Sequence, residues 1–212
     1  MNRETLQQLT AFNFSPAAYV HTTHFEEVDT LNLLPASPTN VHARRMLSEY
    51  INRYFGLSDT FFPDKLDTQT KKFIACSSKQ LYNLIHAAGA SCYSSQLVKI
   101  IDAEFLKDLK AAISEEAFIF GIKNGRFLFQ SAVVNRRLAG SSTQMATNVK
   151  NAGLAVLYDM LHAHKEAFRD RLLLKLSLND YHQLVDHKTK SLGADFPNCR
   201  KRLYPELIRN FL

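Results

Sequence analysis

The sequence predicts a mainly α-helical protein, a compact bundle of short helices that forms a single domain over residues 1–212. Apolar residues recur at steps of three and four along most of the chain, as on one face of a helix. Only 7 Gly and 6 Pro are present, which disfavours a turn-rich fold of many strands. Hydrophobic residues make up 46% of the chain and charged residues 22%, which is ordinary for a domain that buries its own core.

The N-terminal part contains helix and loop signals in alternation. Residues 4–11 are predicted to form a short helix, which Pro16 interrupts. Residues 31–40 contain two prolines and are predicted to be a loop that ends at Asn40, a suitable helix N-cap. Gly56 suits the position just after the end of the following helix. The apolar stripe of that helix comprises Val41, Leu47, Tyr50, Ile51, Tyr54 and Phe55.

Residues 57–72 contain several charges and the run Phe61-Phe62-Pro63. This composition predicts a connecting loop that places aromatic rings on the core. The wider segment 57–77 is the best candidate in the chain for a mobile connection.

The central part is predicted to contain consecutive short helices with tight corners, as in a small bundle. A helix begins at Ser78 and is predicted to stop at Gly89, with its apolar face formed by Leu81, Leu84, Ile85 and Ala88. A second helix carries Leu97, Ile100 and Ile101. Asp102 is predicted to cap a third helix, whose inward residues are Phe105, Leu106, Leu109, Ala112 and Ile113.

The next helix is predicted to start at Ser114-Glu115-Glu116-Ala117, where acidic residues favour the positive end of the helix dipole. Gly121 and Gly125 flank Lys123-Asn124 and predict a turn. Residues 126–130 fit a short strand or a helical turn, and the pattern does not choose between them.

The longest periodic segment begins at Ser141 or Ser142 and predicts a helix with the stripe Met145, Val149, Ala152, Val156 and Met160. Residues 171–176 fit a strand or a helix end, so a minor β element stays open. Pro197 suits the first turn of a last helix, which Pro205 is predicted to interrupt. That helix is predicted to pack against the rest of the domain through Leu203, Leu207, Ile208 and Phe211.

Cysteine use and hydropathy point to the cytoplasm. Cys76, Cys92 and Cys199 are odd in number and far apart, which suits a reducing compartment and three buried thiols. The N-terminus is polar and lacks an apolar signal core. No apolar run approaches the roughly 20 residues that span a bilayer. We therefore expect the protein to stay on the cytoplasmic side.

No motif predicts catalysis, a cofactor or a metal site. The chain lacks Walker A, GxGxxG, HExxH and GxSxG sequences. The pairs His21/His24 and His162/His164 have no further ligand at a zinc-type spacing, and Glu26-Glu27 and Glu115-Glu116 have no paired base. We therefore predict a protein that is not an enzyme.

The formal charge of +6 is scattered, with tight clusters at Lys71-Lys72 and at Arg200, Lys201 and Arg202. The cluster at residues 200–202 leaves open an alternative function, a small basic helical module that binds nucleic acid or a membrane surface. We favour a solvated surface, in which positive charges on a C-terminal helix also complement the helix dipole. Nucleic-acid binding is not expected.

The most informative stretch is Phe14-Ser15-Pro16-Ala17-Ala18-Tyr19-Val20-His21. It resembles the N-terminal Phe-x-Pro-x-x-Tyr-aliphatic-His signature of the SctK family, which includes the YscK, PscK, OrgA and MxiK proteins. Residues 78–128 resemble the central helical run of the family. Residues 143–176 resemble its late segment, a long helix followed by an Arg-Leu-x-Leu-x-Leu element, here Arg171 to Leu176.

The resemblance implies a cytoplasmic adaptor of the bacterial type III secretion injectisome, peripheral to the inner membrane. In the family, SctK proteins of the sorting platform lie between the cytoplasmic domain of the ring protein SctD and the pod protein SctQ. Through SctQ and SctL they help to assemble the complex of the ATPase SctN. They bind and position, and are not known as enzymes.

Two roles are open for the motif residues Phe14, Pro16, Tyr19 and His21. Pro16 fixes its own φ and restricts Ser15 to extended backbone, so Phe14 and Tyr19 are predicted to lie in the core. His21 is predicted to hydrogen-bond a neighbouring backbone group. The alternative is that these residues contact SctD or SctQ directly. We favour the structural role, because buried aromatics beside a proline usually organise a fold.

Overall fold

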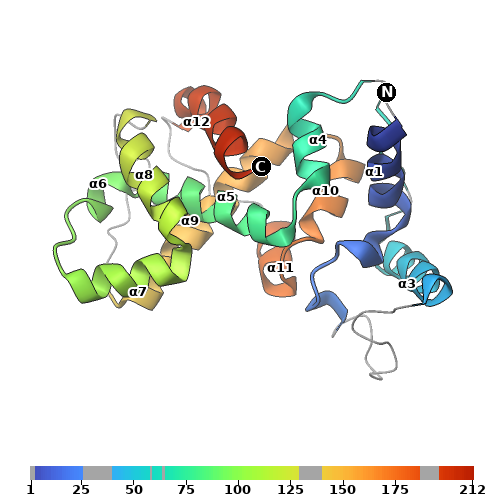
Figure 1. The fold of residues 1–212 in the computed structure, drawn as a ribbon, viewed down its shortest axis with the longest axis horizontal. Coiled ribbons are helices and arrows are strands. Elements are labelled where there is room, and N and C mark those ends of the chain that lie inside the picture. The colour runs from blue at the N-terminus through green and yellow to red at the C-terminus, as the bar shows by residue number, and fades with distance from the viewer. Residues whose placement is uncertain (1–2, 26–39, 58, 64, 129–139, 187–195) are drawn as a thin grey trace. The chain divides into compact units, whose positions relative to one another are not determined.

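The computed structural model describes residues 3–25, 40–57, 59–63, 65–128, 140–186 and 196–212. Within these ranges the chain forms eleven α-helices, one short 3-10 helix and no strand (Figure 1). Helices make up 78% of the described residues, which confirms the mainly α prediction. Neither segment that also fitted a strand forms one where it is described: α8 (Glu115–Leu128) covers residues 126–128, and α10 (Glu166–Leu173) ends in a turn over residues 174–176.

The chain divides into two units. Unit 1 comprises residues 1–78 and 162–186, and unit 2 comprises residues 79–161 and 187–212. The organisation of residues 1–212 as a single domain stays a prediction.

Unit 1 contains α10 and five further elements, which are α1 (Arg3–Phe14), η1 (Pro16–Ala18), α3 (Val41–Tyr54), α4 (Thr68–Ala75) and α11 (Leu178–Asp186). The 3-10 helix η1 packs against α1 and α3, and α1 also packs against α3 and α4. One buried apolar cluster consists of Val20, Leu47, Ile51, Leu57 and Leu174. The segment after η1, helix α3 and the segment after α10 therefore share one core.

Helix α3 begins and ends where the sequence predicts. The Asn40 side chain accepts a 2.8 Å hydrogen bond from the His42 N–H. Gly56 follows the C-cap residue with φ +62°, a left-handed conformation that favours glycine. The predicted apolar stripe is wider than the face that the core covers: Leu47 and Ile51 are buried, but Val41 is 78% exposed and Tyr50 and Tyr54 are also exposed.

The predicted loop over residues 57–72 is wrong from Thr68 onward, where α4 begins. Asp67 caps this helix, since its carboxylate accepts hydrogen bonds from the Thr70 N–H at 2.8 Å and the Thr70 hydroxyl at 2.7 Å. The expected placement of aromatics holds for Phe61, which is buried, and not for Phe62, which is 46% exposed. Residues 31–39, with their predicted loop, lie outside the described residues.

Unit 2 contains α8 and five further helices, which are α5 (Ser78–Cys92), α6 (Ser94–Leu97), α7 (Ala103–Ile113), α9 (Ser142–His162) and α12 (Phe196–Phe211). Asp102 caps α7 as predicted, accepting from the Phe105 N–H at 3.0 Å. The stripe of α9 is confirmed by the buried Met145, Val149, Val156 and Met160. Helix α6 is short, and Ile101, predicted as apolar face, is 93% exposed.

Three glycines predicted to end or interrupt helices lie inside them instead. A Cβ on Gly89 in α5 would lie 1.8 Å from the Val149 carbonyl oxygen of α9, and a Cβ on Gly121 would lie 2.5 Å from the Ala90 Cβ. A Cβ on Gly125 would lie 2.7 Å from the Ser91 carbonyl oxygen. These positions need glycine because two helix backbones approach each other there, and not because the chain turns.

The last helix is continuous through Pro205, contrary to the predicted interruption. Pro205 lies on the exposed side of α12, where water can bond the carbonyl that lacks a helical N–H partner. The predicted packing residues Leu203, Leu207 and Ile208 are buried. The Phe211 ring lies 5.2 Å from the Phe120 ring of α8.

Candidate binding surface around the N-terminal motif

The motif occupies the end of α1 and the 3-10 helix that follows. Phe14 is the last residue of α1, and Pro16 opens η1 and is buried. Tyr19 ends η1. Its hydroxyl donates a 2.8 Å hydrogen bond to the Phe12 carbonyl, and its ring stacks on the Phe12 ring at 5.5 Å. Burial raises the pKa of Tyr19, so the phenol stays protonated and keeps donating this bond.

His21 connects the motif to the segment after α10. Its backbone N–H donates a 2.8 Å hydrogen bond to the Leu174 carbonyl. Its ring Nδ1 accepts from the Thr23 backbone N–H at 3.3 Å, which is the predicted bond to a neighbouring backbone group. Three residues on, the buried His24 ring places Nε2 2.9 Å from the Leu176 carbonyl oxygen. The motif and the Arg171–Leu176 element therefore lie side by side.

Lys175 is the feature that the sequence analysis missed. It is 2% exposed, and its Nζ donates to the carbonyls of Phe73 at 3.0 Å, Ile74 at 2.8 Å and Cys76 at 2.7 Å. These carbonyls form the end of α4, where the negative pole of the helix dipole favours a cation. Burial lowers the pKa of Lys175, which the neighbouring Cys76 thiol opposes.

The ammonium of Lys175 also faces the motif. Nζ lies 5.6 Å from the centre of the Tyr19 ring and 5.9 Å from that of the Phe12 ring, within the range of cation–π attraction. Arg171, one turn earlier, is buried as well and donates to the Leu57 carbonyl at 2.9 Å. Two buried cations thus fasten α10 to α4 and to the segment after α3. A charge inside a leucine run, as in Arg171-Leu-Leu-Leu-Lys175, is the sequence signal that could have revealed them.

Phe14 departs from the rest of the motif. It is 51% exposed, so its predicted place in the core is wrong. The reason is its position: Phe12 and Asn13 turn inward at the end of α1, and Phe14 then points outward. Its ring lies 6.1 Å from that of Phe62, which is also exposed.

A groove with a volume of about 450 Å³ lies beside Phe14. We call it the α1–α3 groove. Its wall on the α1 side is Phe14 and Ser15, and its wall on the α3 side consists of Val41, Arg44, Arg45, Ser48, Glu49 and Asn52. It is open to solvent and carries both apolar and charged side chains, which suits a protein segment better than a small substrate.

A comparison with protein families shows to which family the chain belongs. A family model described as YOP proteins translocation protein K (YscK) matches residues 8–197. The chain belongs to the YscK family. This is the SctK family of type III secretion proteins, so the resemblance drawn from the motif is confirmed. No curated protein and no solved structure matches the chain.

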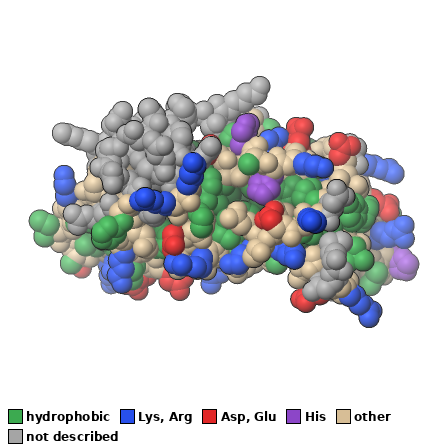
Figure 2. Space-filling view, turned by 90° about the horizontal axis from the view of Figure 1, so that it is seen from above, with side chains coloured by type: hydrophobic (Ala, Val, Ile, Leu, Met, Phe, Trp, Pro, Cys, Tyr) green, Lys and Arg blue, Asp and Glu red, His purple; other side chains and the backbone are tan. Residues whose placement is uncertain are grey.

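The match to the YscK family ends at Pro197, before the basic cluster of α12. Lys201 and Arg202 are exposed there, and the Arg200 side chain is not among those described. The cluster lies in the first half of α12, so the predicted complement to the C-terminal end of the dipole is wrong for these residues. In Figure 2, Lys and Arg side chains lie interspersed with Asp and Glu side chains.

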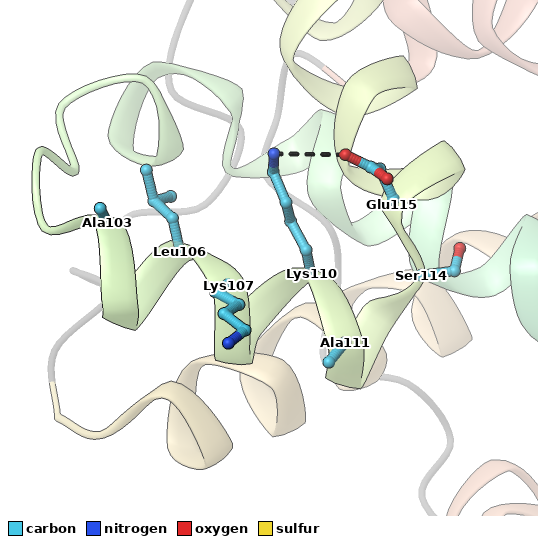
Figure 3. Close-up of a pocket in the computed structure, with 7 residues that line it drawn as sticks. All are labelled: Ala103, Leu106, Lys107, Lys110, Ala111, Ser114 and Glu115. Carbon is cyan, nitrogen blue, oxygen red and sulfur yellow. Dashed lines mark hydrogen bonds and ion pairs between the residues drawn. The ribbon is translucent and has the colours of Figure 1, made fainter.

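A second groove of this YscK-family protein lies in unit 2 (Figure 3). It has a volume of about 700 Å³ and runs along α7 to the start of α8, past Ala103, Leu106, Lys107 and Lys110. Lys110 Nζ lies 3.4 Å from a carboxylate oxygen of Glu115, which closes the groove at the start of α8. Ser114, with φ +67°, forms the corner between the two helices.

The remaining candidate groups do not come together as a reactive site in the described part of the chain. Among the residues described, no group of three or more His, Cys, Asp or Glu side chains could hold a metal ion. Cys76 and Cys92 are buried as predicted, while Glu26-Glu27 and the Cys199 side chain lie outside the described residues. No described helix is long and apolar enough to cross a membrane.

Proposed function

We propose that this protein is an adaptor of the cytoplasmic sorting platform of the type III secretion injectisome. It binds the cytoplasmic domain of SctD on one side and SctQ on the other, and through SctQ and SctL it connects to the ATPase SctN. Its place is the bacterial cytoplasm, at the face of the inner membrane. The observation that carries the proposal is the family match over residues 8–197.

The geometry of unit 1 supports an adaptor that presents a preformed surface. An adaptor holds its partners at fixed positions, so its binding face must stay rigid when a partner binds. The hydrogen bonds of His21 to Leu174 and of Lys175 to the end of α4 fix helices that are distant in sequence. Partner binding then needs little ordering of the body, which favours affinity.

Exposed apolar side chains on α3 also support a protein-binding role. Met46 is 71% exposed, and Tyr50 and Tyr54, one turn apart, stack at 6.3 Å and are each nearly half exposed. Tyr, Met and Arg are enriched in interfaces between proteins. Binding and positioning are all that this role requires, and we propose no catalytic activity.

Co-purification tests the proposal. The protein carries an affinity tag in a cell that expresses the whole secretion machine, and mass spectrometry identifies what elutes with it. We expect both SctQ and SctD. Recovery of neither, from a preparation whose circular dichroism shows folded helix, would refute the adaptor role. The same protein made in a cell without the machine is the control for nonspecific capture.

A further inference from the structure

The α1–α3 groove has an apolar side that lacks cover among the described residues. Phe14 is 51% exposed and Val41 is 78% exposed, and both line the groove. An inserted apolar side chain would remove surface of both residues from water, which is favourable by about 25 cal/mol per Å² of apolar area. Of the other motif members, Pro16 is buried at the start of η1, and the Tyr19 hydroxyl donates to the Phe12 carbonyl of α1.

The charge of the groove selects the sign of its occupant. Two arginines, Arg44 and Arg45, line the groove against a single acid, Glu49. The Arg45 Nε donates to Glu49 at 3.1 Å, and this bond uses one of the five N–H donors of the guanidinium. The balance favours carboxylates, which arginine binds with two parallel hydrogen bonds, and disfavours a basic segment.

Asn52 adds an independent sign of a missing partner. It lines the groove, and its Oδ1 is buried and accepts no hydrogen bond from any described residue. A buried acceptor without a donor costs about 1–3 kcal/mol, so such atoms usually mark a place where a ligand or water completes the bond.

The walls of the groove are held at a fixed spacing. The Ser48 hydroxyl donates to the Arg44 carbonyl at 2.9 Å and accepts from the Ala17 N–H of η1 at 3.3 Å. This pair of bonds joins the 3-10 helix of the motif to α3. The groove is therefore formed before an occupant arrives.

We propose that the α1–α3 groove binds an acidic protein segment that inserts one large apolar side chain beside Phe14 and Val41 and places carboxylates on Arg44 and Arg45. The inference rests on the proposed adaptor role, since it names the chemistry by which this protein recognises a partner. Within the family motif, Phe14 is the residue that touches the partner, and Pro16, Tyr19 and His21 hold the groove in place.

The test titrates the full chain separately with purified SctQ and with the purified cytoplasmic domain of SctD from the same bacterium. Three variants probe the groove: Phe14→Ala, the double variant Arg44→Glu/Arg45→Glu, and Asn52→Leu. Phe127→Ala, which truncates an 80% exposed ring of α8, and Lys79→Glu, at an exposed position of α5, are the matched controls. The melting temperature of each variant is measured alongside.

We expect the three groove variants to weaken binding of one partner at least tenfold, with the other partner and both controls unchanged and melting temperatures close to that of the wild type. Asn52→Leu should melt no lower than the wild type, because it removes a buried acceptor without a donor. Unchanged affinity of all three groove variants for both partners overturns the inference and leaves the adaptor role intact. A wild type that binds neither partner refutes the adaptor role itself.

Photo-crosslinking identifies the bound segment, and charge reversal tests its chemistry. A photo-crosslinking amino acid at position 14 marks the partner peptide that lies in the groove, and the expected peptide contains at least two Asp or Glu residues near a Leu, Ile, Phe or Met. Replacing those acids by Lys should restore binding to the Arg44→Glu/Arg45→Glu variant. A crosslinked peptide without acids, or the absence of such rescue, contradicts the proposed chemistry.

Discussion

The backbone N–H of His21 lies 2.8 Å from the carbonyl oxygen of Leu174, and this hydrogen bond joins the N-terminal motif to the Arg171–Leu176 element. The two stretches in which the resemblance to the family was found are thus one structural feature. Tyr19 and Lys175 extend the contact, with the Tyr19 ring on one side of the ammonium and the last carbonyls of α4 on the other. The Tyr19 ring also stacks on Phe12 of α1, two residues before Phe14.

Truncating Tyr19 should destabilise the protein. Tyr19→Ala removes a ring that stacks on Phe12 and should lower the free energy of unfolding by about 3 kcal/mol, the low end for buried aromatics because the ring is only partly buried. Tyr19→Phe loses only the bond to the Phe12 carbonyl and should lose about 1 kcal/mol. Urea denaturation measures both, with exposed Phe14→Ala as control. If Tyr19→Ala melts like the wild type yet loses partner binding, the structural role is wrong.

Removing the Lys175 ammonium should destabilise α4. Lys175→Met keeps the aliphatic stem but removes the donor that Lys175 supplies to the carbonyls of Phe73, Ile74 and Cys76, which should lower the free energy of unfolding by about 1–3 kcal/mol. Faster amide hydrogen exchange confined to α4 would locate the effect. Lys79→Met, at an exposed position of α5, should change neither quantity. A stable Lys175→Met variant with unchanged exchange would show that these bonds contribute nothing net.

The sequence predicts local features well, because the residues that decide them are neighbours. Asn40 and Asp102 cap their helices, and Gly56 ends α3, through contacts within four residues. Lys175 could not be placed in the same way. Its burial depends on carbonyls at the end of α4, about a hundred positions away in the chain. The hydrophobic periodicity of a segment does not indicate a hydrogen-bond partner so distant in the sequence.

The candidate surface was only partly predictable for the same reason. The placement of Pro16 and Tyr19 is local, because Pro16 opens η1 and the Tyr19 hydroxyl bonds the nearby Phe12 carbonyl, whereas His21 also depends on the distant Leu174 carbonyl. The exposure of Phe14 depends on which neighbours of α1 turn inward, and the groove depends on how η1 meets α3. Glycines follow this pattern too, since Gly89 resembles a helix stop in sequence and is a helix contact in space.

The crossing of α5 and α9 should not tolerate a methyl group. A Cβ on Gly153 would lie 1.8 Å from the Ile85 carbonyl oxygen, so Gly153→Ala must push the two helices apart. We expect a loss of about 1–3 kcal/mol in the free energy of unfolding, although alanine is the better helix former. Thr147→Ala, on the exposed side of the same helix, should lose little. A Gly153→Ala variant more stable than the wild type would show that the helices are not in contact there.

His164 should make stability fall at mildly acidic pH. Burial lowers the pKa of His164 below its ordinary value of 6.5, more than the Asp67 carboxylate raises it. The unfolded chain therefore takes up the proton first, and stability should decline as the pH falls below about 6.5 towards the lower pKa of the folded state. His164→Gln should flatten this part of the curve, which urea denaturation at a series of pH values measures. Equal slopes in the variant and the wild type would exclude His164 as the cause.

The most direct test of the account mixes the purified protein with purified SctQ and the purified cytoplasmic domain of SctD from the same bacterium, and measures the molar mass of the eluting species by light scattering. We expect one species that contains all three chains. When SctQ or the SctD domain is left out, we expect a complex of the protein with the partner that remains. A folded protein that elutes alone from the mixture would contradict the account.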